Sequence, residues 1–377
     1  MNEKTKWIAL GNTTELLAEL QAQGGLKEIV VEERRIVLSH AGGNFGALNA
    51  RCNHMGAPLA KGRLKGGCIE CPWHYWQFDH ASGEAKHAAH EPLASSGGQV
   101  PRYPLKIESE TLFVDLGGES ERVRPTYNPG HPVGREPKRE AGGIRVLGLS
   151  TTAMDRAHPR YSTSEDLLKS SLARAGRELG VETRFLALAD LKFRACEGFY
   201  SKSEKACTWP CSITKMDPED EMATVYEALV HWADVVIVAT PIRWGSASSL
   251  YYKMAERLNA VQNQITLKDR VLIQNKVAAF FITGGQDNIQ AVAGQMLTFF
   301  GELGFTSPPF PFVAHSRGWS AEDMERNETS VRQDESLHGH AFELVARAVA
   351  LAKKTLPEAA AAPSERREAE IHKPGAH

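Results

Sequence analysis

Residues 51–79 read RCNHMGAPLAKGRLKGGCIECPWHYWQFD and contain two short pairs of cysteine and histidine. The first pair is Cys52-x-His54 and the second is Cys71-x-x-His74, with sixteen residues between them. Each pair puts a thiolate and an imidazole on one loop, and a β-scaffold can bring two such loops together around a diiron core. Thiolates suit the more buried ferric iron, whereas neutral imidazoles raise the reduction potential of the other iron. The spacing therefore predicts a [2Fe-2S] cluster ligated by Cys52, His54, Cys71 and His74.

A tetrahedral zinc site is the alternative, because two cysteines and two histidines are also a common zinc ligand set. Zinc fingers usually pair like ligands, whereas each pair here is mixed. The segment resembles the Rieske ferredoxin family, whose loops have the patterns C-x-H-x-G-x-x-L and C-P-x-H-x-x-x-F-D. The matching residues are Cys52, His54, Gly56 and Leu59, followed by Cys71, Pro72, His74, Phe78 and Asp79. The resemblance covers residues 5–116 and implies a Rieske [2Fe-2S] domain.

One position departs from the pattern of that family. Tyr75 follows the second histidine, where the family commonly has glycine. Glycine suits tight turns because it adopts positive φ angles without steric cost. The tyrosine is therefore expected either to alter the turn of the loop or to cover the cluster.

The composition is that of a folded globular protein. Of the 377 residues, 42% are hydrophobic and 24% are charged, and the formal net charge is -2. A chain of this length fits two domains, and its small net charge gives no broad cationic surface for nucleic acid or anionic lipid. The first residues lack the apolar core of a signal peptide, and no stretch approaches the ~20 apolar residues of a membrane helix. These features predict a cytoplasmic protein.

The chain is predicted to be multidomain, with two unlike halves. From Lys27 to about Leu116, short apolar runs alternate with glycine and proline, which predicts an all-β domain. Residues 117–142 lack apolar periodicity and predict an extended linker. After them, strand-like and helix-like segments alternate, which predicts an α/β flavodoxin-like domain with a doubly wound parallel sheet. The expected divisions are residues 1–116, 117–142, 143–356 and a disordered tail at 357–377.

Three loops of the second half lie where a phosphate and a flat ring would bind. Ser162, Thr163 and Ser164 open a helix whose N-terminal N–H groups can hold a phosphate, although such residues are also ordinary N-caps. Two further loops follow the strands VVIVATP and AAFFITGG, and open α/β sheets bind ligands beyond strand carboxyl ends. In these loops the candidate ring contacts are Pro241, Ile242, Arg243, Trp244, Gly245, Ser246, Ala247, Thr283, Gly284, Gly285 and Gln286.

This half resembles the flavodoxin-like NAD(P)H-dependent FMN reductase family. The carrying stretch is ATPIRWGSASSLYYKMAERL, with Lys253, Glu256 and Arg257 in register with that family. The resemblance implies FMN as cofactor and NADH or NADPH as cosubstrate. It places the FMN phosphate at Ser150, Ser162, Thr163 and Ser164, and the ring against residues 241–247 and 283–286. A doubly wound domain without flavin is the alternative.

Three cysteines occupy an irregular stretch of the second half, at Cys196, Cys207 and Cys211. The stretch resembles a loop that holds a second cluster in iron-sulfur flavoproteins of the same family. With ten residues between the first two cysteines and no fourth one nearby, a four-cysteine cluster lacks a ligand. Free thiols in a substrate-facing loop are expected instead.

Together the two resemblances predict an NAD(P)H-dependent flavin oxidoreductase. A hydride delivers two electrons and a [2Fe-2S] cluster accepts one at a time, and FMN can connect the two processes. The cofactors supply this chemistry, so no acid-base catalytic residue is nominated. The expected partners are NAD(P)H and a small-molecule or protein acceptor. Reductases that resemble this half commonly form dimers or tetramers, which implies a homo-oligomer.

Two alternative functions remain open from the sequence. The first is an electron-transfer module that serves a partner oxygenase or reductase and has no substrate of its own. The second is a redox-sensing regulator, which has less support because no DNA-binding motif or basic face is present. The identity of the acceptor stays open in all three hypotheses.

Overall fold

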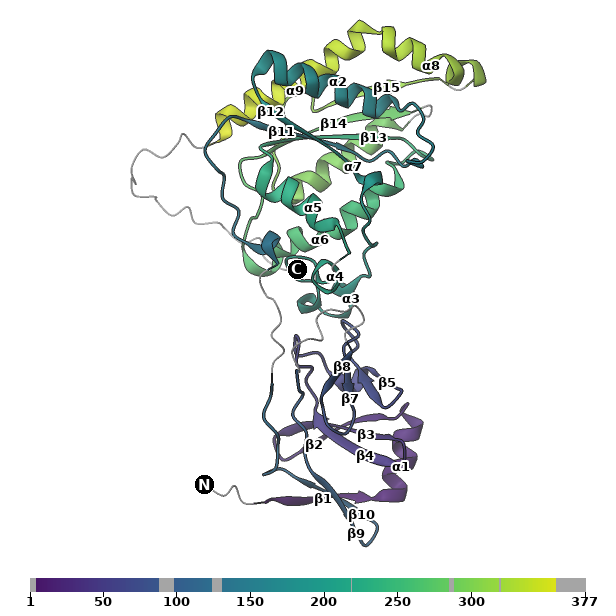
Figure 1. Ribbon diagram of the computed structural model, residues 1–377, viewed down its shortest axis with the longest axis vertical. Coiled ribbons are helices and arrows are strands. Elements are labelled where there is room, and N and C mark those ends of the chain that lie inside the picture. The colour runs from purple at the N-terminus through teal and green to yellow at the C-terminus, as the bar shows by residue number, and fades with distance from the viewer. Residues whose placement is uncertain are drawn as a thin grey trace, which may run out of the picture.

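The computed structural model describes residues 5–87, 98–123, 131–217, 219–284, 288–318 and 320–356. Figure 1 shows two bodies along its vertical axis, with the N-terminal half below and the C-terminal half above. The lower body contains three small antiparallel sheets, and the upper body contains one parallel sheet between helices. The predicted fold class is therefore confirmed. The predicted tail at 357–377 lies outside the described residues.

Three sheets build the first domain. The first has the order β1-β10-β9, the second β2-β3-β4 and the third β5-β6-β7-β8. Apolar side chains between these sheets form two clusters, one of which includes Cys52 and Cys71. The strands are β1 (Trp7–Asn12), β2 (Leu26–Val31), β3 (Arg34–Ala41), β4 (Asn44–Asn49), β5 (Arg63–Lys65), β6 (Cys68–Glu70), β7 (Gln77–Asp79), β8 (Ala85–His87), β9 (Leu105–Glu108) and β10 (Thr111–Asp115).

One helix in this domain was not predicted. Helix α1 (Thr13–Ala22) lies between β1 and β2, and the side chain of Asn12 caps it by accepting a hydrogen bond from Thr14 N at 2.9 Å. Only Leu16 and Leu20 of this helix are buried. Two buried positions give a weak helical period, so the pattern of the sequence did not reveal the helix.

The second domain is built on a five-stranded parallel sheet with the order β12-β11-β13-β14-β15. The chain leaves β11 toward β12 on one side and later returns to β13 on its other side. The carboxyl ends of β11 and β13 therefore form a topological switch point, where open α/β sheets bind ligands. The strands are β11 (Arg145–Ser150), β12 (Glu182–Ala187), β13 (Val235–Pro241), β14 (Val277–Gly284) and β15 (Phe312–Ser316).

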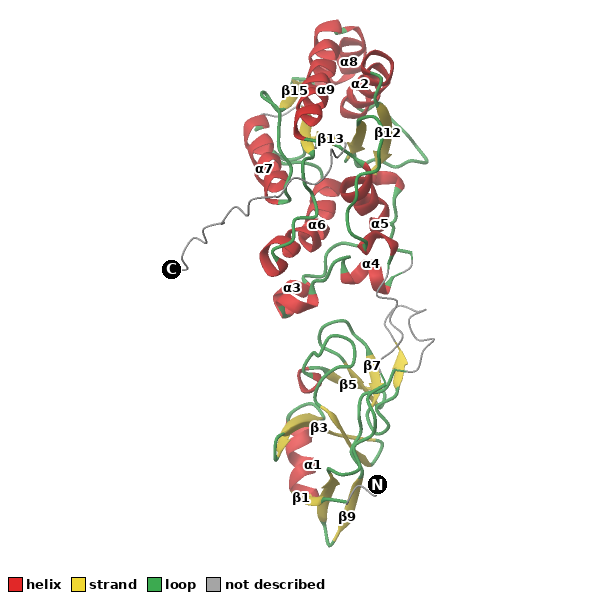
Figure 2. Ribbon diagram, turned by 90° about the vertical axis from the view of Figure 1, so that its left-hand side faces the viewer, coloured by secondary structure: helices red, strands yellow, loops and turns green. Residues whose placement is uncertain are grey.

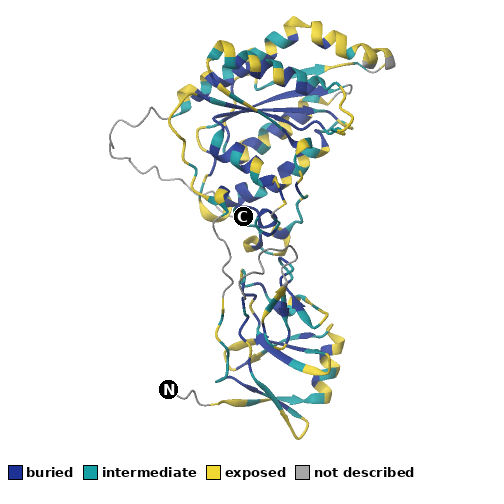
Figure 3. Cartoon of the chain, viewed as in Figure 1, coloured by how far each residue is buried: buried dark blue, intermediate teal, exposed yellow. Residues whose placement is uncertain are grey.

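Helices cover both faces of this sheet (Figures 1 and 2). Helices α2 and α9 pack on one face, and α5, α6 and α7 pack on the other. A π-helical segment, η6 (Glu227–Trp232), continues α5. Figure 3 shows that the buried residues concentrate in the sheet and in the helix faces turned toward it. The helices are α2 (Thr163–Leu179), α5 (Met222–Tyr226), α6 (Ser249–Lys268), α7 (Ile289–Glu302), α8 (Ala321–Gln333) and α9 (Glu335–Thr355).

An insertion of short helices lies between β12 and α5. It contains η4 (Leu188–Asp190), α3 (Phe199–Lys202), η5 (Glu204–Ala206) and α4 (Ser212–Met216). Arg257 of α6 anchors this insertion, because its guanidinium donates to both carboxylate oxygens of Asp220 at 2.9 and 2.6 Å and to Thr214 Oγ1 at 2.7 Å. Arg257, which belongs to the stretch that resembles the FMN reductase family, therefore stabilises the fold of the insertion.

The described ends of the predicted linker are packed against the two domains. The carbonyl oxygen of Val123 accepts from Gln99 N at 2.7 Å and from the side-chain amide of Asn53. The carbonyl oxygen of Val133, in the turn η3 (Pro132–Gly134), accepts from His231 Nε2 at 2.8 Å. Each described end is therefore bound to the nearer domain. Residues 124–130 lie outside the described part of the chain.

Candidate functional site

Two loops of the first domain hold the four predicted cluster ligands. The first loop joins β4 to β5 and the second joins β6 to β7. In the first loop Gly56 N donates to Cys52 O at 3.0 Å, and in the second Tyr75 N donates to Cys71 O at 3.1 Å. Gly56 has a φ of 78° and Tyr75 a φ of 61°. The loops thus make the same turn, and a tyrosine occupies a position that normally favours glycine.

Like side chains face each other across the two loops. The thiols of Cys52 and Cys71 are buried and close enough to shift each other's pKa, and the ring centroids of His54 and His74 lie 4.7 Å apart. No three His, Cys, Asp or Glu side chains among the described residues group around a single ion position. A pair of sulfurs next to a pair of imidazoles is the donor arrangement of a two-iron cluster with Cys₂ and His₂ ligation.

The contacts of His74 define which of its nitrogens can bind iron. His74 Nε2 lies 2.9 Å from the carbonyl oxygen of Ala206. A carbonyl oxygen only accepts, so Nε2 bears the proton and Nδ1 has a free lone pair. Nδ1 is buried and has no hydrogen-bond partner among the described residues. A buried polar atom left without a partner destabilises a fold unless a ligand completes it, and iron would do so.

The ionisation of these side chains also suits a metal cluster. Burial lowers the pKa of His54 to about 3 and the pKa of His74 to about 4, so both imidazoles are neutral at neutral pH. The hydrogen bond between the thiols lowers the pKa of Cys71 and, together with burial, raises the pKa of Cys52. Neutral imidazole and thiolate are the forms that bind metal, and the lowered pKa of Cys71 shifts that thiol toward its binding form.

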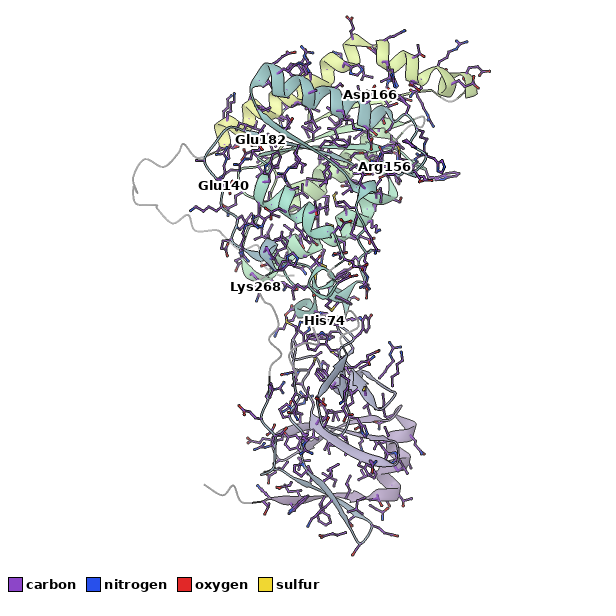
Figure 4. The ribbon with its side chains drawn as sticks, viewed as in Figure 1. His74, Glu140, Arg156, Asp166, Glu182 and Lys268 are labelled. Atoms are coloured by element: carbon purple, nitrogen blue, oxygen red, sulfur yellow. The ribbon has the colours of Figure 1, made fainter. Side chains whose placement is uncertain are left out.

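A second candidate site lies at the carboxyl edge of the parallel sheet. Arg156, labelled in Figure 4, is in the loop after β11 at this edge. The loops form a cavity of about 100 Å³. Its lining residues are Thr152, Met154, Arg160, Tyr161, Ser162, Thr163, Pro241, Ile242, Arg243, Thr283, Gly284, His315, Arg317 and Asn327.

Hydroxyl groups gather at the N-terminus of α2 beside this cavity. Thr152 Oγ1 lies 3.0 Å from Ser162 Oγ and 2.9 Å from Ser164 Oγ. The hydroxyl of Thr163 accepts a hydrogen bond from Asn327 Nδ2 at 2.8 Å, which leaves its own proton available. Hydroxyls and free N–H groups at a helix N-terminus are suited to a phosphate.

The predicted flavin residues divide into those that line the cavity, those that do not, and two that the structure does not describe. Those that line the cavity are Ser162, Thr163, Pro241, Ile242, Arg243, Thr283 and Gly284. Ser150 is buried and donates to Glu165 Oε1 at 2.8 Å, and Ser164 is buried behind Thr152. Trp244 is 94% exposed, and neither it nor Gly245, Ser246 or Ala247 lines the cavity. Gly285 and Gln286 lie outside the described residues.

Two arginines near the cavity were not predicted. Burial lowers the pKa of Arg243, and the charges of the nearby Arg160 and Arg317 lower it further. No carboxylate is among the described lining residues, so the three positive charges favour binding of an anion in the cavity. Arg160 lies in the loop after β11 and Arg317 follows β15, so the rule that ligands bind at strand carboxyl ends points to both.

The three cysteines of the insertion lie in different surroundings. Cys196 lines a cavity of about 630 Å³ together with residues of α6 and α7. Burial and the nearby Cys211 raise the pKa of Cys207 to about 11, and Asn259 Nδ2 lies 3.5 Å from its sulfur. A thiol with such a pKa is protonated and weakly reactive at neutral pH.

The described helices include none that is both long and apolar enough to cross a bilayer.

Family models match both halves of the chain. The model of the Rieske [2Fe-2S] domain matches residues 6–104. The model of NADPH-dependent FMN reductases matches residues 156–320. The first match contains all four candidate cluster ligands, and the second contains most of the cavity lining.

Curated relatives resemble one half or the other. The ferredoxin component of the naphthalene 1,2-dioxygenase system of Pseudomonas putida is 31% identical over 111 residues, which are 29% of this chain and 96% of the ferredoxin. Human apoptosis-inducing factor 3 is 33% identical over 91 residues, 24% of this chain and 14% of that protein. The 8-demethyl-8-aminoriboflavin-5'-phosphate synthase of Streptomyces davaonensis is 26% identical over 166 residues, 44% of this chain and 61% of the synthase. The chain thus spans less than two thirds of the last two proteins.

Proposed function

Because the chain belongs to the Rieske [2Fe-2S] ferredoxin family through its first domain and contains an NADPH-dependent FMN reductase domain, we propose that it passes electrons from NAD(P)H through FMN and the cluster to an acceptor. It is an FMN-dependent oxidoreductase with a [2Fe-2S] cluster. When bound, FMN takes a hydride and releases its two electrons singly, as a one-electron cluster requires. The observation that supports the proposal is that one chain pairs two thiols and two imidazoles in its first domain and gathers hydroxyls and arginines around a cavity in its second.

The proposed cluster ligands have separate roles. Cys52 and Cys71 would hold one iron, and His54 and His74 would hold the other. The carbonyl oxygen of Ala206 accepts a hydrogen bond from His74 Nε2. This bond fixes the tautomer in which Nδ1 is free to bind iron. Cys52, Cys71 and His74 are buried, and the ring nitrogens of the half-buried His54 are shielded from solvent, so water has little access to the sulfurs and the ring nitrogens.

The proposed flavin contacts follow from charge and geometry. Ser162, Thr163 and the N-terminus of α2 would donate to the FMN phosphate, and Arg160 and Arg243 would balance its charge. The ring would lie against two backbone segments, Pro241–Ile242 and Thr283–Gly284. A Cβ added at Gly284 would lie 2.8 Å from Ile242 Cβ, so glycine lets these two segments approach each other closely.

Replacement of Arg243 by glutamine is expected to weaken FMN binding about 10-fold. A hydrogen bond to a charged group contributes about 1.5–3 kcal/mol, and the neighbouring arginines retain part of the field. The measurement is the dissociation constant of the apoprotein for FMN, compared with that for riboflavin, which lacks the phosphate. Riboflavin affinity should change less than about twofold. An equal loss for both ligands would argue against a phosphate contact.

We also infer a homo-oligomer. In Figure 4, His74 lies at the junction of the two domains, whereas Arg156 lies toward the carboxyl edge of the sheet. A separation seen in projection is a lower limit, so the cluster and the flavin pocket of one chain are apart. Electron transfer to a cluster from the flavin of a neighbouring chain is consistent with this arrangement. The molar mass in solution, measured by light scattering, tests the inference, and a monomer would contradict it.

The second candidate function is an electron-transfer module for a partner oxygenase. The similarity to the naphthalene dioxygenase ferredoxin favours it, since this chain covers 96% of that protein. Anaerobic addition of NADPH to the purified chain separates the two functions. A reduced-cluster electron paramagnetic resonance (EPR) signal without any other reductase supports the oxidoreductase. A signal that requires an added reductase supports the module.

A further inference from the structure

The insertion of the second domain contacts the cluster loop of the first. The ring centroid of Phe199 lies 5.1 Å from that of His74 and 6.1 Å from that of Tyr75, with edge-to-face geometry. Trp73 and Tyr75 pack against the apolar core of the second domain, in which Phe199 is buried. The surface formed by Trp73, His74 and Tyr75, here named the histidine edge, is therefore covered by its own chain.

Lys202 clamps this contact. Its Nζ donates to Tyr75 Oη at 2.8 Å and to the carbonyl oxygen of Trp73 at 3.4 Å. The same ammonium lies 4.3 Å from the ring centroid of Tyr75 and 4.9 Å from that of Phe199, within the range of cation-π attraction. One cation thus binds two aromatic rings that come from different domains.

The positive φ of Tyr75 gives a second argument. A non-glycine residue in this region is held there by its surroundings, and such residues are enriched at functional sites. Glycine would make the same turn without strain but would provide neither the ring nor the hydroxyl that Lys202 contacts. Tyr75 is thus a positioning residue for the second domain.

The second domain also contacts the proposed cluster ligand His74 directly. Ala206 O, which accepts from His74 Nε2, accepts from Ser212 Oγ at 2.8 Å as well. Ser212 belongs to α4, which the Asp220 and Arg257 pair holds through Thr214. The histidine is therefore connected to the framework of the second domain through a short series of hydrogen bonds.

We propose that the histidine edge is a docking surface for the segment Phe199–Ala206 of the same chain, and that an external protein acceptor reaches this edge only after the two domains separate. The inference rests on the proposed assignment of His74 as a cluster ligand. The proposal extends the proposed function, because the contact between Tyr75 and Lys202 would control whether a large partner can approach the cluster.

The test uses the full-length holoprotein and three variants. Tyr75→Gly removes the ring and the steric cost of the positive φ. Lys202→Met removes the ammonium group but keeps an apolar side chain of similar length. Lys205→Met is the matched control, since no contact of Lys205 with the first domain is found among the described residues. Amide hydrogen exchange of residues 197–208 reports docking. The rate at which one electron passes from the reduced cluster to the ferric haem of added cytochrome c reports access to the edge.

Tyr75→Gly and Lys202→Met are expected to speed amide exchange in this segment at least about tenfold and to raise the rate of cytochrome c reduction several-fold. Lys205→Met should match the wild type in both. Unchanged exchange and an unchanged rate, in variants that retain the EPR signal of the cluster, would overturn the docking proposal. Absence of that signal from the wild type would instead overturn the cluster assignment.

Discussion

Replacement of Cys71 by serine is expected to abolish the cluster while leaving the flavin functional. A serine hydroxyl is a poor substitute for the buried thiolate, and Cys71 pairs with Cys52 at the centre of the site. Iron should fall from two atoms per chain to nearly none. Electron transfer to cytochrome c should fall by more than about 100-fold, since loss of an outer partner of a metal ligand alone costs about 10- to 100-fold. Anaerobic bleaching of the flavin by NADPH should persist.

The matched control for this variant is Cys68→Ser. Cys68 lies on β6 only three residues away, but its side chain is partly exposed and is not part of the thiol pair. Iron content and electron transfer should remain at the wild-type level. Loss of the cluster in both variants, or retention in both, would contradict the assignment of Cys71 as a ligand.

Replacement of Arg257 by alanine is expected to destabilise the second domain by about 3–5 kcal/mol, because it leaves the carboxylate of Asp220 buried without its counter-charge. Both side chains are fully buried, and the closest nitrogen and oxygen atoms lie 2.6 Å apart. Urea unfolding monitored by tryptophan fluorescence measures the loss. Glu178→Ala, which breaks an exposed ion pair with Arg174 on α2, should cost less than about 1 kcal/mol.

The loss of stability caused by Arg257→Ala is expected to decrease as the pH falls. Burial raises the pKa of Asp220, but the hydrogen bond and charge of Arg257 outweigh burial, so the pKa lies below its usual value. A carboxyl with a lowered folded-state pKa stabilises the fold above its unfolded-state pKa of ~3.9, and this stabilisation is lost as the pH falls through the folded-state pKa. In Arg257→Ala burial raises the pKa of Asp220 without the opposing charge, so the difference in stability between wild type and variant should narrow as the pH falls from neutral toward the folded-state pKa of the wild type. A difference that is constant between pH 7 and pH 3 would argue against the ion pair as its cause.

Short local patterns predicted much of this molecule. The spacing of Cys52, His54, Cys71 and His74 identified two loops, and the structure brings their side chains together in like pairs. The continuous apolar run of β13 predicted a buried parallel strand, and the sheet has it at its centre. Such features depend on residues close in sequence, so they can be read before the fold is known.

Features that depend on distant residues were not predicted. Arg317 approaches Arg243 only because β15 lies beside β14 in the sheet. Ser150 has a phosphate-compatible hydroxyl, but its contact with Glu165 of α2 occupies it. The contact between Tyr75 and Lys202 joins residues 127 positions apart, and only the unusual tyrosine gave a local indication of it. Tertiary contacts of this kind have no periodicity in the sequence.

The central claim is that two thiolates and two imidazoles hold a diiron cluster. Pulsed EPR of the anaerobically reduced protein, prepared with ¹⁵N-labelled histidine, tests it most directly. The account predicts magnetic couplings to two histidine nitrogens in the wild type, and loss of the spectrum in Cys71→Ser. A reduced protein whose spectrum shows no coupling to histidine nitrogen, or a wild type that binds no iron, would contradict it.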